Sequence, residues 1–162
     1  MEAARIEGIL GDELVSWEHV GSTAVPGLMA KPILDLMPIV RDIKALVTYR
    51  SRMESAGYNW YGEYGLPGRR YFNRNDPATN VRIANIHVYE ADNPEVMRHL
   101  AFRDYLRANH QIARQYEELK RTCADLCPDD VNAYNDCKND WIKAIELPAI
   151  QAWSPSKPNV HD

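Results

Sequence analysis

Residues 19–40 constrain the fold of this chain more than any other stretch. They read HVGSTAVPGLMAKPILDLMPIV, and the last nine are short, apolar and rich in Ile, Leu and Val, which predicts a strand. Because apolar residues occupy both alternating positions, we expect a central strand with both faces covered. Asp35 interrupts this apolar run. A lone carboxylate in a buried strand is costly unless it is paired, so Asp35 must meet a cation, a metal ion or a hydrogen-bond donor.

The segments around this strand predict an α/β or α+β fold. Before it we expect the tail of a helix over residues 1–12 and a strand over 14–20. After it, the spacing of apolar residues predicts a helix over 42–56, with Asp42 as its N-cap and Gly57 as its stop. The remaining expected elements are strands over 58–61, 70–74 and 81–90, a turn-rich loop over 62–69, and three helices after Pro94. Together they predict a mixed sheet with C-terminal helices packed on it.

The composition is that of an ordinary globular domain. The chain has 162 residues, of which 45% are hydrophobic and 26% charged, so disordered and fibrous classes are excluded. We expect one domain over residues 1–152 and a frayed tail over 153–162. The net charge of −4 argues against a nucleic-acid partner. No apolar run approaches the roughly 20 residues of a membrane helix and no secretory signal is visible, so we expect a cytoplasmic protein without a membrane partner.

The three cysteines lie close together, at positions 123, 127 and 137. An odd number confined to one region fits reduced, buried thiols in the cytoplasm better than a framework of disulfides. Zinc is disfavoured because no histidine lies nearby to complete a ligand set. We therefore expect free thiols.

Gly21 and Ser22 form a candidate phosphate-binding turn. Backbone N–H groups at a helix N-terminus bind phosphate well, although an isolated Gly-Ser pair is more typical of a strand-ending turn whose serine caps a helix. Lys31, just before the central strand, is either a second phosphate contact or a solvated loop lysine. Asp35 itself has a structural alternative, which is a salt bridge to Lys31 or to an arginine.

Two further positions carry groups suited to a phosphate site. Arg69 and Arg70 follow a glycine-rich loop, and guanidinium groups match the geometry of phosphate. If Arg70 opens a strand, the two side chains point to opposite faces and at most one reaches the site; we favour Arg70. His87 lies on the mixed face of its strand, where an isolated histidine is more often a core residue than a ligand or a base. Glu18 and Glu63 are weaker candidates, because exposed carboxylates are common.

Long ordered segments of the chain resemble one family. Besides residues 19–40, they are GLPGRRYF (65–72), IHVY (86–89) and RHLAFRDYLRANHQIARQYEELK (98–120). On these segments the chain resembles the GrpB family, a largely uncharacterised bacterial group placed in the nucleotidyltransferase-fold superfamily. The same module is also known fused to dephospho-coenzyme A kinase. The resemblance implies a nucleotidyltransferase-like mixed sheet.

The superfamily resemblance also implies a phosphate site. In these proteins a Gly-Ser turn holds the triphosphate, and two acids one residue apart on the next strand bind a pair of divalent metal ions. Gly21-Ser22 matches the turn and Asp35 the first acid, but Met37 stands at the second acid position and cannot bind Mg²⁺. His87 stands where a third acid is expected, and imidazole suits softer metals than Mg²⁺.

The resemblance therefore predicts binding of a nucleotide or another phosphorylated small molecule, with Mg²⁺ or Mn²⁺ at Asp35 as the cofactor to test. Ser22 would hold phosphate, Lys31 and Arg70 would neutralise it, Asp35 would position a metal ion or the incoming hydroxyl, and His87 would act as acid, base or ligand. Two functions stay open. One is a nucleotidyltransferase, and the other is a non-catalytic accessory module linked to coenzyme A metabolism.

Overall fold

The structure is a computed structural model, which describes residues 1–28 and 32–153. The chain forms two compact units, Met1–His99 and Leu100–Asp162. The expectation of one domain over residues 1–152 stays a prediction. Within the described part of the chain, no helix is long and apolar enough to cross a membrane.

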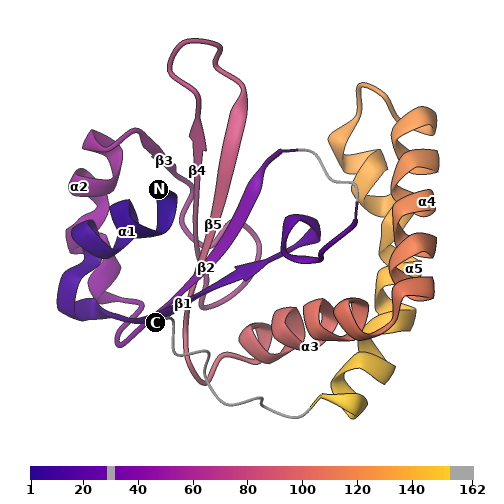
Figure 1. Cartoon of the computed structure of the whole chain (residues 1–162). Helices are drawn as coiled ribbons and strands as arrows, with labels where there is room; N and C mark the ends of the chain where they lie inside the picture. The colour runs from indigo at the N-terminus through magenta and orange to yellow at the C-terminus, as the bar shows by residue number, and fades with distance from the viewer. Residues whose placement is uncertain (29–31, 154–162) are drawn as a thin grey trace. The chain divides into compact units, whose positions relative to one another are not determined.

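The first unit is built on a five-stranded mixed sheet with the strand order β1-β2-β5-β4-β3 (Figure 1). Its strands are β1 (Leu14–Val20), β2 (Leu34–Val40), β3 (Tyr58–Trp60), β4 (Arg70–Asn75) and β5 (Arg82–Glu90). Only β2 and β5 pair in parallel among these strands; the other three pairings are antiparallel. All five expected strands are confirmed, but β5 and not β2 occupies the middle of the sheet. β2 is nonetheless internal, and its last five residues are buried.

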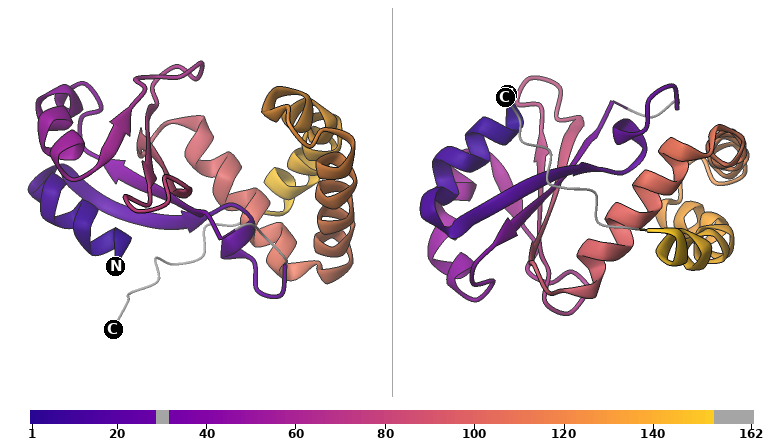
Figure 2. Two further views of the ribbon diagram at one scale, coloured as in Figure 1. Left: turned by 90° about the horizontal axis from the view of Figure 1, so that it is seen from above. Right: turned by 60° about the horizontal axis from the view of Figure 1, so that its bottom comes forward.

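One face of the sheet carries the hydrophobic core. The helices α1 (Glu2–Leu10) and α2 (Arg50–Ser55) lie on this side, as two views show (Figures 1 and 2). Ile6 and Leu10 of α1 and Met53 of α2 are buried in one cluster with sheet residues such as Leu36 and Ile86. Because side chains alternate along a strand, Asp35 and its neighbours at every second position face the opposite side. Residues that alternate with the core residues therefore lie on the other face of the sheet, where they can form a site.

The helix expected over residues 42–56 was wrong in its extent. The segment is a 3₁₀ helix η3 (Ala45–Tyr49) followed by the short α2. Asp42 does not cap an α-helix; its side chain accepts a hydrogen bond from the Lys44 N–H at 2.8 Å, which closes a local turn. The Thr48 hydroxyl donates to the Ala45 carbonyl at 2.7 Å. Such local bonds, together with β-branched residues, compete with regular α-helical geometry.

The later helices follow the prediction more closely. They are α3 (Pro94–Ala108), α4 (His110–Leu126) and α5 (Val131–Ala152), and α3 runs from the first unit into the second. The Asp130 side chain caps α5 by accepting a hydrogen bond from the Ala133 N–H at 3.0 Å. Within the second unit, Tyr116 of α4 stacks on Trp141 of α5 with ring centroids 5.2 Å apart. The predicted tail beyond Trp153 lies outside the described residues.

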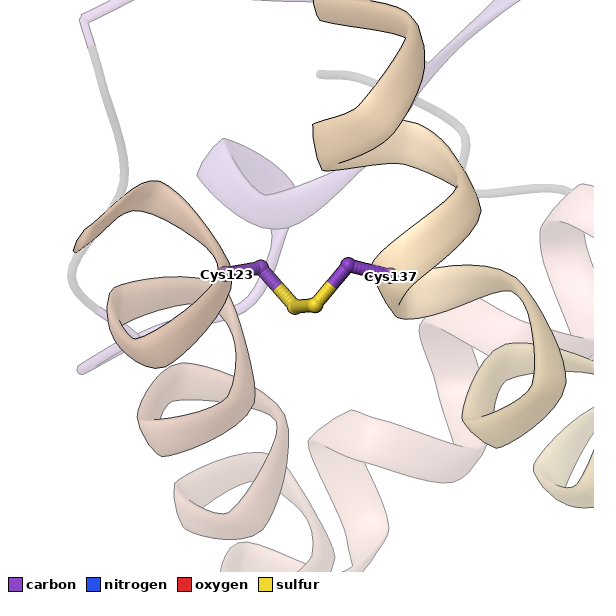
Figure 3. Close-up of a disulfide and its surroundings, with 2 residues drawn as sticks. All are labelled: Cys123 and Cys137. Carbon is purple, nitrogen blue, oxygen red and sulfur yellow. A yellow bond between two sulfur atoms is a disulfide. The ribbon is translucent and has the colours of Figure 1, made fainter. Parts of the chain in front are cut away.

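The expectation of three free thiols was wrong, because Cys123 and Cys137 form a disulfide (Figure 3). The bond joins α4 to α5, with 5.8 Å between the two Cα atoms. The turn between the helices brings a residue before it next to a residue after it, which the linear spacing did not reveal. Cys127 remains the free cysteine of the three.

Thiol titration tests the disulfide. Protein purified without reductant and then denatured should present one reactive thiol, Cys127, and three after reduction. The bond joins residues that are 14 positions apart, so it closes a short loop in the unfolded chain. Reduction opens this loop and should lower the free energy of unfolding by about 3 kcal/mol. A Cys127→Ser variant should show the same loss. Three reactive thiols before reduction would contradict the assignment.

Candidate functional site

The face of the sheet opposite the core carries a row of polar side chains. Asp35 pairs with Asn85 across β2 and β5, and Asn85 pairs with Asn73 across β5 and β4. One step along the strands, His87 pairs with Tyr71. All five side chains lie on the side that the apolar core does not use, since they alternate with core residues along their strands. This row is the candidate site.

Asp35 is held by two hydrogen-bond donors. Its Oδ1 atom accepts a bond from Asn85 Nδ2 at 3.0 Å and lies 3.3 Å from His87 Nε2. Since a carboxylate accepts, the hydrogen at this contact belongs to His87 Nε2. The sequence predicted that the Asp35 carboxylate needs a partner, and the structure supplies two, an amide and an imidazole, for a side chain that is half-buried. Lys31, the lysine considered as its partner, lies outside the described residues.

Asn85 links Asp35 to a phenol and a cation. The Tyr71 hydroxyl donates to Asn85 Oδ1 at 2.8 Å, and Arg82 Nη1 donates to the same oxygen at 3.1 Å. Burial raises the pKa of Tyr71, so its hydroxyl stays protonated and available as a donor. The network thus runs from the carboxylate through an amide to a guanidinium group, and every bond in it has a clear donor and acceptor.

The backbone of the turn after β1 approaches the Asp35 side chain closely at Gly21. Its φ of +73° lies in the region that favours glycine, and a Cβ atom added there would lie 2.7 Å from Asp35 Oδ2. No side chain can occupy that space without moving the carboxylate. Ser22 follows at the start of a 3₁₀ helix, η2 (Ser22–Ala24), in place of a longer helix. The predicted turn and the predicted acid are therefore brought together.

His87 is packed between aromatic neighbours. Its ring centroid lies 5.3 Å from that of Tyr71 and 6.0 Å from that of His99 on α3. In the described structure, His87 Nδ1 is a buried atom without a hydrogen-bond partner. The Nε2 atom beside Asp35 is consequently the ring nitrogen through which this histidine can exchange a proton at the site.

His99 is a second imidazole beside His87, and the sequence analysis did not identify it. Its Nδ1–H donates to the Glu95 carbonyl at 2.7 Å, because a carbonyl oxygen can only accept. Burial, reinforced by the positive charge of Arg98, lowers the pKa of His99 to about 4. His99 is therefore neutral at physiological pH.

Of the remaining predicted residues, Arg70 lies away from the site, Glu63 is bonded within its own loop, and Glu18 shares the face of Asp35. Alternation along β4 places Arg70 on the side of Phe72, away from Tyr71, and its Nη1 atom bonds the Arg69 carbonyl at 2.9 Å. Glu63 accepts a bond from the Gly68 N–H at 2.9 Å within its own loop. Glu18 pairs with Met37 across β1 and β2 and so shares the face of Asp35. The structure brings together Gly21, Asp35 and His87, and separates Arg70 from them.

Four polar residues at the site were not identified as functional from the sequence: Asn73, Asn85, Tyr71 and Arg82. Asn85 shares the strand parity of His87, so alternation alone could have placed it on the same face. Tyr71 required the register of β4 against β5, which the sequence did not define. Arg82 reaches Asn85 and Tyr71 through its long side chain, and no local pattern indicates that reach.

The described residues do not fit a two-metal centre. No group of three or more His, Cys, Asp and Glu side chains placed to hold a metal ion occurs among residues 1–28 and 32–153. Asp35 is one carboxylate, and its Oδ1 atom is bonded by the amide of Asn85 and lies beside the imidazole of His87. Mg²⁺ requires more oxygen ligands than this.

A cavity in the second unit is a weaker candidate. It has a volume of about 780 Å³ and is lined by residues of α3, among them Asp104, by residues of α5, and by Asn109 and Trp153. Asp104 is already bonded to Arg103 Nε at 2.8 Å and to Trp153 Nε1 at 3.4 Å. Since its acid is paired within the unit, this cavity offers less binding chemistry than the Asp35 face.

The fold and the site define an α/β protein whose mixed sheet presents a glycine turn, an acid and a histidine on one face. The chain belongs to the GrpB family, because the family model described as GrpB protein matches residues 1–147. A solved structure described as conserved protein GrpB from Enterococcus faecalis is 42% identical, with a TM-score of 0.86, and the match covers 93% of this chain and 88% of that one. The resemblance to the family is thereby confirmed.

Two curated relatives are longer than this chain. UPF0157 protein YqkA of Bacillus subtilis is 40% identical over 160 residues, which are 99% of this chain and 46% of the relative. A protein named dephospho-CoA kinase from Mycobacterium leprae is 27% identical over 164 residues, which cover 86% of this chain and 40% of that protein. The chain thus spans about half the length of the first and less of the second.

A substitution at Gly21 tests the contact with Asp35. Gly21→Ala should lower the free energy of unfolding by about 1–3 kcal/mol, since it places a Cβ atom against the carboxylate at a positive φ. Gly8→Ala is the matched control: nothing lies within 4 Å of that added Cβ, and a helix favours alanine over glycine. Urea unfolding measures both. Equal stability of the wild type and Gly21→Ala would contradict the geometry.

The pH dependence of stability tests the burial of His99. A pKa lowered to about 4, against an ordinary value near 6.5, means that the unfolded chain binds a proton before the folded one does. Neutral His99 therefore does not reduce stability above about pH 6.5. As the pH falls from 6.5 toward 4, the unfolded chain takes up the proton first, and the free energy of unfolding decreases. At about 1.4 kcal/mol per pKa unit, the free energy of unfolding falls by at most about 3.5 kcal/mol.

Urea unfolding at several pH values compares two variants in which a histidine is replaced by asparagine. His99→Asn keeps a donor near the Glu95 carbonyl and should reduce the dependence between pH 6.5 and 4. His110→Asn, at an exposed histidine, should leave it unchanged. A His99→Asn profile parallel to that of the wild type would show that His99 does not cause the loss.

Proposed function

We propose that this protein binds a nucleotide or another phosphorylated small molecule on the sheet face that carries Asp35, against the turn at Gly21 and Ser22. The observation that supports this most is the close approach of Gly21 to the Asp35 carboxylate. An acid held beside a turn without side-chain bulk, and next to His87, is an arrangement that packing alone does not require. The family resemblance, which relates this turn and this acid to phosphate binding, points the same way.

The charge of the ligand requires cations near Asp35, since a phosphate and a carboxylate repel each other. We assign this role first to Arg82, whose guanidinium group lies at the Asn85 end of the network. His87 supplies a second positive charge when it is protonated. Arg70 is no longer our preferred contact, because it lies on the other side of β4. Lys31 remains a proposed contact.

A transfer reaction at this site would use the Asp35 carboxylate to orient the incoming hydroxyl and accept its proton. His87 would act as the acid and give its Nε2 proton to the departing group, since Nδ1 is buried. Mg²⁺ or Mn²⁺ remains a proposed addition at Asp35. Most of its coordination would have to come from the phosphate oxygens and water, because the described residues supply too few oxygen ligands.

A non-catalytic accessory role is the second candidate. Met37 is fully buried on the strand position where the superfamily carries its second acid, so that position contributes packing and no charge. The relatives named dephospho-CoA kinase join a segment like this chain to a longer protein, which suits a module that acts on a partner domain. This candidate retains ligand binding and omits the transfer.

Thermal unfolding of the whole chain tests the proposal. The probes are the four ribonucleoside triphosphates and dephospho-coenzyme A, each with and without Mg²⁺ or Mn²⁺. A ligand at 100 times its Kd stabilises by about 2.7 kcal/mol, which raises the Tm of a chain of this size by several degrees. Asp35→Asn and Ser22→Ala should abolish the rise measured against each variant's own Tm.

Asp125→Asn is the matched control, since Asp125 is an exposed acid on α4, and it should keep the full rise. The proposal is wrong if no probe stabilises the wild type, or if Asp35→Asn and Ser22→Ala keep the whole rise. A nucleotide-dependent product detected by mass spectrometry and lost in Asp35→Asn would exclude the purely accessory role.

A further inference from the structure

Three tyrosines cluster beside the candidate site. Tyr61 and Tyr64 come from the loop after β3, and Tyr71 comes from β4. The ring centroids lie 5.3 Å apart for Tyr61 and Tyr64, 5.6 Å for Tyr61 and Tyr71, and 5.1 Å for Tyr64 and Tyr71. The cluster was not identified from the sequence, because its members are separated by turns.

Two of the three rings are open to solvent. Tyr64 is 63% exposed and Tyr61 is 42% exposed, while Tyr71 beneath them is 8% exposed. Tyr64 stacks on Tyr71 with an angle of 19° between the ring planes. A large aromatic ring stacked on a buried one and open to solvent is a surface on which another flat ring can stack.

The loop holds Tyr64 in place through its backbone. Tyr64 has a φ of +48°, a backbone conformation that residues other than glycine and asparagine seldom adopt. The buried Arg69 fixes this conformation by donating from Nη2 to the Tyr64 carbonyl and from Nε to the Glu63 carbonyl. The Arg69 guanidinium also lies 5.1 Å from the centre of the Tyr71 ring. The backbone of Tyr64 is therefore held by bonds that do not involve its own side chain.

Tyr71 connects the tyrosine cluster to Asp35. Its ring lies under Tyr64, and its hydroxyl donates to Asn85, which in turn donates to Asp35. Only β5 separates β4 from β2, so their backbones lie about 10 Å apart. A nucleoside with one or more phosphates is long enough to cover that span, with its base at the tyrosines and its phosphate at the Gly21 turn.

We propose that Tyr61 and Tyr64 form a stacking platform that selects ligands with a flat aromatic ring, namely nucleotides, over other phosphorylated molecules. This inference rests on the proposed function and names the substrate class of that same site. Stacking on tyrosine tolerates different bases, so the platform selects for the presence of a base more than for its identity.

Calorimetric titration of the whole chain tests the platform. The probes are ATP, GTP, CTP and UTP, with tripolyphosphate and ribose 5-phosphate as phosphates that lack an aromatic ring. At least one nucleotide should bind about tenfold or more tighter than either tripolyphosphate or ribose 5-phosphate. Tyr64→Gly should weaken nucleotide binding by about tenfold and leave tripolyphosphate binding unchanged, whereas Tyr64→Phe should bind as the wild type does.

Tyr64→Gly is chosen because glycine favours the positive φ and the Arg69 bond uses the backbone carbonyl, so the loop should keep its shape. Val47→Ala, at a residue with the same 63% exposure on η3, is the control and should not change binding. Circular dichroism and the Tm confirm that each variant is folded.

The outcomes separate this inference from the proposed function. If tripolyphosphate or ribose 5-phosphate binds as tightly as every nucleotide, or if Tyr64→Gly weakens all probes alike, the platform is wrong while phosphate binding stands. If none of the probes binds the wild type, the proposed function fails, and the platform fails with it.

Discussion

The Asp35 carboxylate is the constraint around which the first unit is arranged. An acid placed in an internal strand must be compensated, and the polar face of the sheet is organised to do so. Asn85 and His87 bond one carboxylate oxygen, and the absence of a side chain at Gly21 leaves room for the other. The apolar face beneath α1 and α2 holds the strands in the register that brings these residues together.

The sequence predicted the elements well and their long-range contacts less well. Alternation and turn residues were sufficient for all five strands, because each signal lies within a few neighbouring residues. The Cys123–Cys137 bond and the Tyr64–Tyr71 stack join residues across a turn, so no local pattern encodes them. Arg70 was misplaced for a related reason: its type suited phosphate, but strand parity decided which face it occupies.

The polar row has two chemically different ends. The Gly21 turn and Asp35 lie at one end of the polar row, and the exposed tyrosines lie at the other, with Tyr71 between them. We infer that a ligand with a phosphate and a flat ring would lie along this row. Met37 is fully buried on the Asp35 face of β2 and contributes no charge, so ligand binding and metal-assisted transfer need separate tests.

The most direct test of the account is to locate the ligand by NMR. Backbone amide shifts of isotope-labelled protein would be recorded during titration with ATP. The account predicts that the largest changes occur at Gly21, Ser22, Asp35 and Asn85, with smaller changes at Tyr64. Changes confined to the Asp104 and Trp153 cavity of the second unit, or no changes at all, would contradict it.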